Sequence, residues 1–190
     1  MNRAGAAGGN GTGGGAAGVV IRGAGAVIGG LASGAGNVIS GNAGRGILVD
    51  GGNSAVIQGN RIGTTTAGTA ALANTGYGVQ IVSGTNNQIG GASSAAMNVI
   101  AGNSSAGIIL ENAGTTGTLI YGNRLGVNVA GSRLANGASS IAVINSASGT
   151  RIGGRLTGEG NIISGSFDQG IYLANTDQTQ IKGNLIGTNP

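Results

Sequence analysis

A short motif, an isoleucine followed by one further residue and then Gly-Asn, recurs along most of the chain. It reads ISGN at 39–42 and IQGN at 57–60, and it returns as IYGN at 120–123 and IKGN at 181–184. Repeats of about 20 to 50 residues are typical of solenoids, in which each repeat packs only on its neighbours. The chain is therefore predicted to fold as a stack of similar units.

The isoleucine that begins this motif, together with its equivalents elsewhere in the chain, defines the predicted period. Successive members of the series are 18, 18, 24, 19, 20, 24, 19 and 18 residues apart, and every third interval is alike. The series predicts nine rungs of about 20 residues, grouped by threes into a larger unit of about 62 residues. At ~4.8 Å per rung the stack would be a rod of roughly 40 Å. The series is Ile21, Ile39, Ile57, Ile81, Ile100, Ile120, Ile144, Ile163 and Ile181.

The apolar runs indicate strands rather than helices. Each run is short, rich in β-branched residues and bounded by Gly, Asn or Ser, as short strands require. No stretch keeps a helical period for about ten residues. We therefore predict an all-β, single-domain parallel β-helix over residues 18–190. The Gly/Ala-rich residues 1–17 are predicted to be disordered or part of a further rung.

Composition supports a folded chain of this unusual kind. Glycine supplies 44 of the 190 residues, with a single proline and 2 % aromatic residues. The absence of a strict three-residue glycine period excludes collagen, and the regular Ile, Val and Leu argue against disorder. Glycine and asparagine accept the positive φ that sharp turns between strands need. No cysteine is present, so disulfides and thiolate metal sites are excluded.

Asparagines recur at fixed places in the repeat and are predicted to stack in columns. Stacked side-chain amides can hydrogen-bond along a column, as they do in cross-β assemblies. For these residues a structural role is favoured over ligand binding. The expected neighbours on adjacent rungs are Asn42 with Asn60, Asn103 with Asn123, and Ser166 with Asn184, while Asn37, Asn98 and Asn161 open the three-rung units.

The pattern NVISGN…GI.I…I.GN.IGT…ALAN…GV.I…IGG over residues 18–188 resembles the right-handed parallel β-helix repeats of the pectate-lyase-like superfamily. It is also similar to the Gly/Asn-rich repeats of large bacterial secreted and surface proteins. The resemblance implies a right-handed coil and an extracellular or cell-surface location. It does not imply an activity, because the fold hosts lyases, hydrolases, adhesins and spacers.

Acidic residues give little sign of a catalytic centre. The chain has no histidine and five acidic residues. Asp50 and Glu111 occupy equivalent places three predicted rungs apart, about 14 Å at ~4.8 Å per rung. A glycosidase pair needs roughly 5 to 9.5 Å. Asp168 and Asp177 share a predicted rung, which leaves a weak acid pair or ion site open. We therefore expect no enzyme activity, no cofactor and no metal.

Two longer insertions, at 63–74 and 126–136, are predicted to form lateral loops. Arg61 and Arg124 precede them at equivalent phase, and Leu185 stands at the third such position. Surface solvation or packing of the arginine stems is favoured over catalysis. If the chain bound a glycan, these loops would form the groove together with the tyrosines. The tyrosines are Tyr77, Tyr121 and Tyr172.

Charge and hydropathy argue against nucleic acid and membrane as partners. The net charge is +4, and the nine basic residues are scattered rather than clustered. A nucleic-acid surface would need a basic stripe with aromatic residues, so none is expected. No apolar run approaches the ~18 residues of a membrane span, and no signal-peptide core is present.

These features together predict a non-enzymatic structural solenoid of a bacterial extracellular protein. No capping helix is predicted before Val19 or after Ile186, and open β-solenoid ends invite another strand. The chain would then act as a stalk or adhesin shaft within a longer parent chain, or assemble end to end with itself into a fibre. The alternative is a carbohydrate-binding or polysaccharide-processing module.

Overall fold

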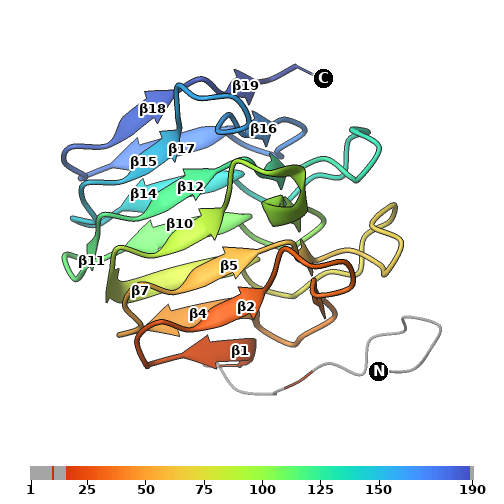
Figure 1. Ribbon diagram of the computed structural model, residues 1–190, viewed down its shortest axis with the longest axis horizontal. Coiled ribbons are helices and arrows are strands. Elements are labelled where there is room, and N and C mark those ends of the chain that lie inside the picture. The colour runs from red at the N-terminus through yellow and green to blue at the C-terminus, as the bar shows by residue number, and fades with distance from the viewer. Residues whose placement is uncertain (1–9, 11–15, 189–190) are drawn as a thin grey trace.

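The computed structural model describes Asn10 and residues 16–188, and these fold into parallel strands stacked in three sheets (Figure 1). Most of the predicted segment 1–17 lies outside the described residues, although Ala17 begins the first strand. The prediction of an all-β, parallel β-solenoid is confirmed. The described chain contains no helix long and apolar enough to cross a membrane.

Each sheet forms one side of the solenoid. Its strands pair in parallel with the equivalent strands of the turns before and after. Sheet A holds β1 (Ala17–Ile21), β4 (Arg45–Asp50), β7 (Val79–Thr85), β10 (Ile108–Glu111), β14 (Ile141–Ile144) and β17 (Ile171–Ala174), with β11 (Thr115–Thr116) beside β7. Sheet B holds β2 (Val27–Gly29), β5 (Val56–Gln58), β8 (Gln88–Gly90), β12 (Leu119–Tyr121), β15 (Arg151–Gly153) and β18 (Gln180–Lys182). Sheet C holds β3 (Val38–Ile39), β6 (Arg61–Ile62), β9 (Val99–Ile100), β13 (Arg124–Leu125), β16 (Ile162–Ile163) and β19 (Leu185–Ile186).

The number of turns differs from the prediction. The chain makes about six turns of about 30 residues, not nine of about 20. The isoleucine series steps through the sheets, because Ile21 lies in sheet A, Ile39 in sheet C and Ile57 in sheet B. Each step of the series is thus two-thirds of a turn, and the 62-residue unit is two turns. Five spacings of ~4.8 Å give a stack about 24 Å high rather than 40 Å.

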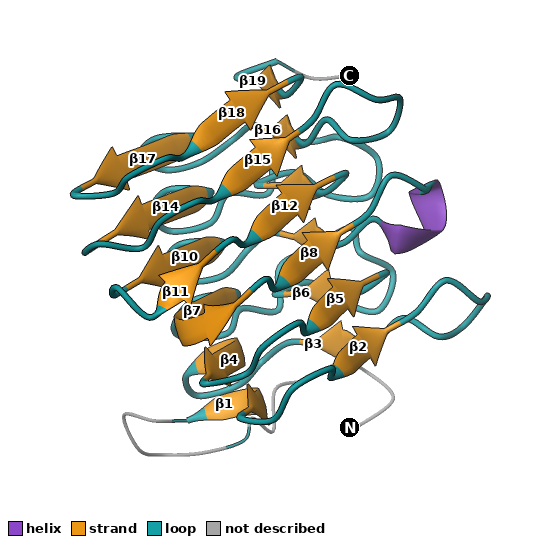
Figure 2. Ribbon diagram, turned by 60° about the vertical axis from the view of Figure 1, so that its left-hand side comes forward, coloured by secondary structure: helices purple, strands orange, loops and turns teal. Residues whose placement is uncertain are grey.

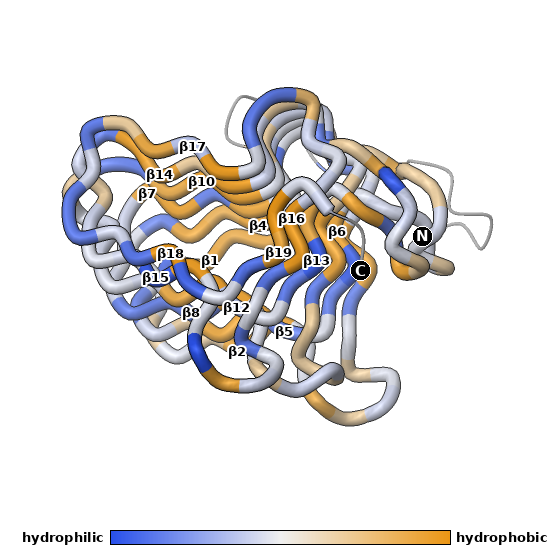
Figure 3. The backbone as a smooth tube through the Cα atoms, turned by 90° about the horizontal axis from the view of Figure 1, so that it is seen from above, coloured by the Kyte–Doolittle hydropathy of each residue, from blue (hydrophilic) through white to orange (hydrophobic). Residues whose placement is uncertain are grey.

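Inward-facing aliphatic side chains from all three sheets fill the solenoid. In sheet A, Val49 pairs with Ile81 and Leu110 pairs with Val143, and these side chains are fully buried. Columns of isoleucine and leucine in sheets B and C close the same core. Viewed down the stack, the turns superpose and apolar strand segments occupy the same sides in each (Figure 3). The core is therefore continuous along the axis.

The corners alternate from one turn to the next, which explains the two-turn repeat. Odd turns have a long corner between sheets B and C, at 91–98 and 154–161 for example, whereas even turns pass this corner with Gly-Asn alone. The 91–98 corner carries a 3-10 helix, Ser94–Ala96 (Figure 2). Even turns instead have the long corner between sheets C and A, at 63–78 and 126–140. Successive long B–C corners are thus two turns apart, and so are successive long C–A corners.

Candidate functional site: asparagine ladders and the last turn

One asparagine from every turn forms a hydrogen-bonded ladder at the corner between sheets B and C. In the first five turns the Nδ2 donates to the Oδ1 of the asparagine in the next turn, at 2.8 to 3.1 Å. We call this column the B–C ladder. Its members in order are Asn37, Asn60, Asn98, Asn123, Asn161 and Asn184.

Asn98 shows how completely the ladder uses each carboxamide. Its Oδ1 accepts from the backbone N of Asn60 at 2.9 Å and from Asn60 Nδ2 at 3.1 Å. Its Nδ2 donates to the carbonyl of Ile57 at 2.8 Å and to Asn123 Oδ1 at 2.9 Å. A primary amide has two donor hydrogens and two acceptor lone pairs, so every site is filled although the side chain is fully buried.

A second column, the C–A ladder, runs along the corner between sheets C and A. Successive side chains are 2.7 to 3.1 Å apart through the same Nδ2-to-Oδ1 bond. In the following turn Ser166 stands at this place, and its Oγ lies 2.6 Å from Ser140 Oγ. The C–A ladder consists of Asn10, Asn42, Asn74, Asn103 and Asn136.

The ladders correct the predicted pairing of the asparagines. Asn42 and Asn60 belong to different corners, so the predicted contact between them is wrong, and so are the other two pairs of that set. The cause is the turn length, because a step of about 20 residues is two-thirds of a turn and moves two corners along the chain instead of to the same corner one turn later. Asn74 and Asn136 were not among the predicted ladder residues, although the Leu-Ala-Asn that recurs within both long corners marks them.

The acidic residues take part in separate contacts. Asp50 and Glu111 lie two turns apart, at the ends of β4 and β10, and not three rungs apart as predicted. Asp50 Oδ2 accepts from Arg22 Nε at 3.2 Å, with both side chains well exposed. Glu111 accepts from Gln80 Nε2 on the outer face of sheet A. Each carboxylate therefore has its own partner.

Asp168 and Asp177 are not brought together. They lie beyond opposite ends of β17, at two different corners of the solenoid, because a strand of sheet A separates them. The idea that they approach each other across a bend is wrong. Among the described residues there is no group of three or more His, Cys, Asp or Glu side chains that could hold a metal ion.

The long corners of turns 2 and 4 stack on each other and project from the same side of the molecule (Figure 1). The backbone N of Val129 donates to the carbonyl of Gly68 at 3.1 Å, and Asn128 Nδ2 donates to the carbonyl of Thr69 at 3.3 Å. Arg124 contacts the loop of turn 4, since its guanidinium donates to the Val129 carbonyl. Arg61 lies next to Gly68 in the loop of turn 2.

The three tyrosines lie on separate parts of the surface. Tyr121 is on sheet B, where the Arg151 guanidinium lies 5.4 Å from its ring centroid. Tyr172 is on sheet A in the last turn and is half exposed, and Tyr77 precedes β7 in the third turn. The structure therefore does not assemble them into one aromatic platform.

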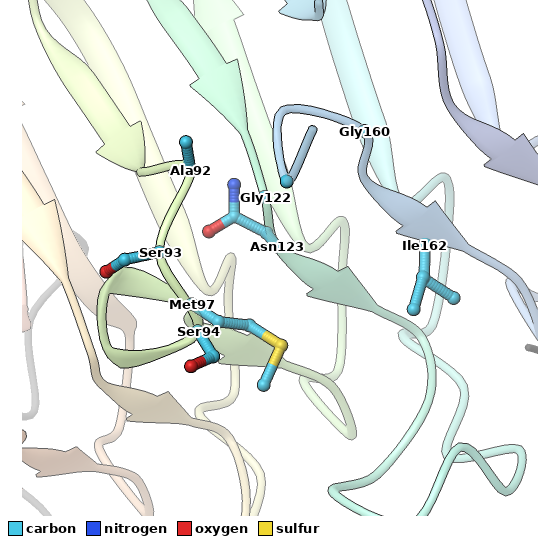
Figure 4. A pocket seen from close by; sticks show the side chains of 9 residues that line it. Ala92, Ser93, Ser94, Met97, Gly122, Asn123, Gly160 and Ile162 are labelled. Carbon is cyan, nitrogen blue, oxygen red and sulfur yellow. The ribbon is translucent and has the colours of Figure 1, made fainter. Parts of the chain in front are cut away.

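A pocket of about 230 Å³ lies between the long B–C corners of turns 3 and 5 (Figure 4). Its floor is Gly122 and Asn123, because turn 4 passes this corner with Gly-Asn alone. Met97 and Ile162 contribute apolar walls, and Ser93 lies at its edge. The Asn123 carboxamide is engaged within the B–C ladder. The pocket is thus a product of the two-turn alternation.

No family model, curated protein or solved structure matches the chain. The assignment to the parallel β-solenoids therefore rests on the strand pairing and the ladders alone.

The last turn exposes the cross-section of the core. Leu173, Ile181 and Ile186 are 40 %, 42 % and 48 % exposed. Their partners one turn below, such as Ile152 and Ile163, are fully buried. At the other end of the stack the core side chains are more covered, since Ile21 and Ile39 of the first turn are buried. The two ends are therefore unlike, and the last turn presents the larger apolar surface.

Proposed function

We propose that this chain is a non-enzymatic structural β-solenoid of a bacterial extracellular or cell-surface protein. It would act as a stalk or adhesin shaft, or as a subunit that stacks end to end into a fibre. The observation that carries the proposal is the pair of asparagine ladders, which use buried carboxamides to join each turn to the next. Relationship to the pectate-lyase-like superfamily and to bacterial surface repeats is part of this proposal.

The physical argument concerns stiffness along the axis. Three parallel sheets and two side-chain ladders connect successive turns, so bending or sliding of one turn on another would break several hydrogen bonds at once. Buried groups without partners are costly, about 1–3 kcal/mol each, and this opposes such distortions. A stack of this kind holds a fixed length, which is the property that a shaft or fibre requires.

Two measurements on the native protein test this proposal. Protease added to intact cells of the source organism is expected to cleave the protein or release it, as for a surface-exposed shaft. The purified chain is expected to leave a panel of acidic and neutral polysaccharides undegraded. Release of reducing ends or unsaturated sugars above that of heat-unfolded protein would overturn the non-enzymatic role. Protection from protease until the cells are lysed would overturn the surface location.

A further inference from the structure

We propose that Arg61 and Arg124 form a binding site for an oxyanion, a phosphate or a carboxylate group, where the long C–A corners of turns 2 and 4 meet. The site is independent of the proposed structural role, because it lies on the side of the solenoid and outside both asparagine ladders. Three observations support it, namely the placement of the two guanidiniums, the lack of a paired carboxylate, and hydrogen-bond donors without acceptors.

Both arginines lie in one column on the outer face of sheet C. Strand pairing aligns Arg61 with Val99, and Val99 with Arg124. The residues that follow the arginines, Ile62 and Leu125, are fully buried in the core, so the arginine side chains start toward the outside. The backbones of turns 2 and 4 are two spacings of ~4.8 Å apart, about 10 Å. The solenoid therefore brings together two arginines that are far apart in the sequence.

The two guanidiniums meet at a single contact between the long corners. Gly68 of turn 2 touches Val129 of turn 4, since the backbone N of Val129 donates to the Gly68 carbonyl at 3.1 Å. The Arg124 guanidinium donates to the carbonyl of Val129. Arg61 lies against Gly68, with its Nε 3.0 Å from the position that a Cβ would take there. The side chains thus hold two positive charges at adjoining residues.

No carboxylate is paired with these charges in the described chain. Its two ion pairs involve other arginines, Arg22 and Arg151. The strands of sheet C and the long corners 63–78 and 126–140 contain no Asp or Glu, and Arg133 adds an exposed guanidinium in the corner of turn 4. Asp168, in the C–A corner of turn 5, makes no ion pair with them. Like charges held this close repel each other, so a bound anion would stabilise the arrangement.

Hydrogen-bond donors at this contact also lack acceptors. Arg61 makes no hydrogen bond to a described residue. The Nε of Arg124 and the Oγ1 of Thr65, which lies in the corner of turn 2, are buried and have no partner within the described chain. Buried polar atoms without a partner are uncommon in folded proteins and can mark the place of a bound ion. Guanidinium groups bind phosphate and carboxylate oxygens through parallel N–H donors, so an oxyanion suits both arginines.

Titration calorimetry at low ionic strength tests the site with two probes, tripolyphosphate for phosphate groups and citrate for carboxylates. The wild-type chain is expected to bind at least one probe saturably, at one site per chain. Arg61→Gln removes an exposed guanidinium and should weaken binding of the preferred probe about tenfold or more. Arg124→Gln should have a similar effect. The probe that binds more tightly shows whether the site takes phosphate or carboxylate.

Arg155→Gln is the matched control, because Arg155 is also exposed and without an ion pair but lies on a B–C corner. It removes the same charge and should change the affinity less than about twofold. Circular dichroism checks the fold of each variant. Equal losses for Arg61→Gln and Arg155→Gln would mean that net charge alone attracts the probes, which would overturn the site. Lack of saturable binding of both probes to the folded wild-type chain would also overturn it.

Discussion

Replacement of Asn98 by alanine is expected to lower the free energy of unfolding by about 4 kcal/mol, a large fraction of the stability of a typical domain. The side chain is fully buried in the middle of the B–C ladder. Its removal deprives the Asn60 backbone N and the Ile57 carbonyl of a buried partner and leaves a cavity. Each orphaned group contributes about 1–3 kcal/mol to the loss.

Asn37→Ala is the matched control, because Asn37 is the exposed first member of the same ladder. Its backbone N can still donate to Asn60 Oδ1 at 3.0 Å, so only the Nδ2 bond is lost. We expect a change below about 1 kcal/mol. Urea unfolding followed by circular dichroism measures both values. Similar losses for the two variants would mean that the buried ladder does not hold the turns together.

The second large effect is expected at Gly122, where alanine should destabilise the fold by more than about 3 kcal/mol. Gly122 has a φ of 67°, a left-handed conformation that disfavours any Cβ. The added methyl would also collide with the Gly91 carbonyl oxygen. Because both the backbone and the corner of turn 3 would have to shift, strain and overpacking add.

Gly25→Ala separates these two causes. Gly25 has nearly the same φ, 70°, but a Cβ there would meet no atom within 4 Å. The loss should be limited to the conformational term, roughly 1–2 kcal/mol. Thermal unfolding of the two variants gives the comparison. If Gly25→Ala were as damaging as Gly122→Ala, close contact between corners of successive turns would not explain the glycine at position 122.

The sequence was sufficient to predict the fold class but not the number of turns. β-branched pairs such as Val38-Ile39 and Val56-Ile57 correspond to strands β3 and β5, as expected. The isoleucine period misled because isoleucine recurs in strands of all three sheets. A residue type at a fixed step does not distinguish two-thirds of a turn from a whole turn. Strand pairing shows which strands are stacked, as the pairing of Val56 with Val27 does for β5 and β2.

The asparagine ladders were predicted only in part, because the sequence does not show the length of a turn. The asparagines of both ladders are visible in the sequence, but their neighbours depend on the turn length. The acceptor of Arg124 was not foreseeable, because the path of the loop at 126–136 over its side chain arises from packing between loops. The strong exposure of Ile186 follows from its place in the last turn.

Electron microscopy of the purified chain over a concentration series tests the central claim most directly, namely that this is a structural solenoid extended by stacking. We expect unbranched filaments at high concentration, with an axial subunit repeat of about 29 Å from six turns of ~4.8 Å. Ile186→Asp, which places a charge on the exposed last turn, should remain as short particles, whereas Leu156→Asp on an exposed corner should still form filaments. Single short particles of the wild-type chain at every concentration would contradict stacking between copies.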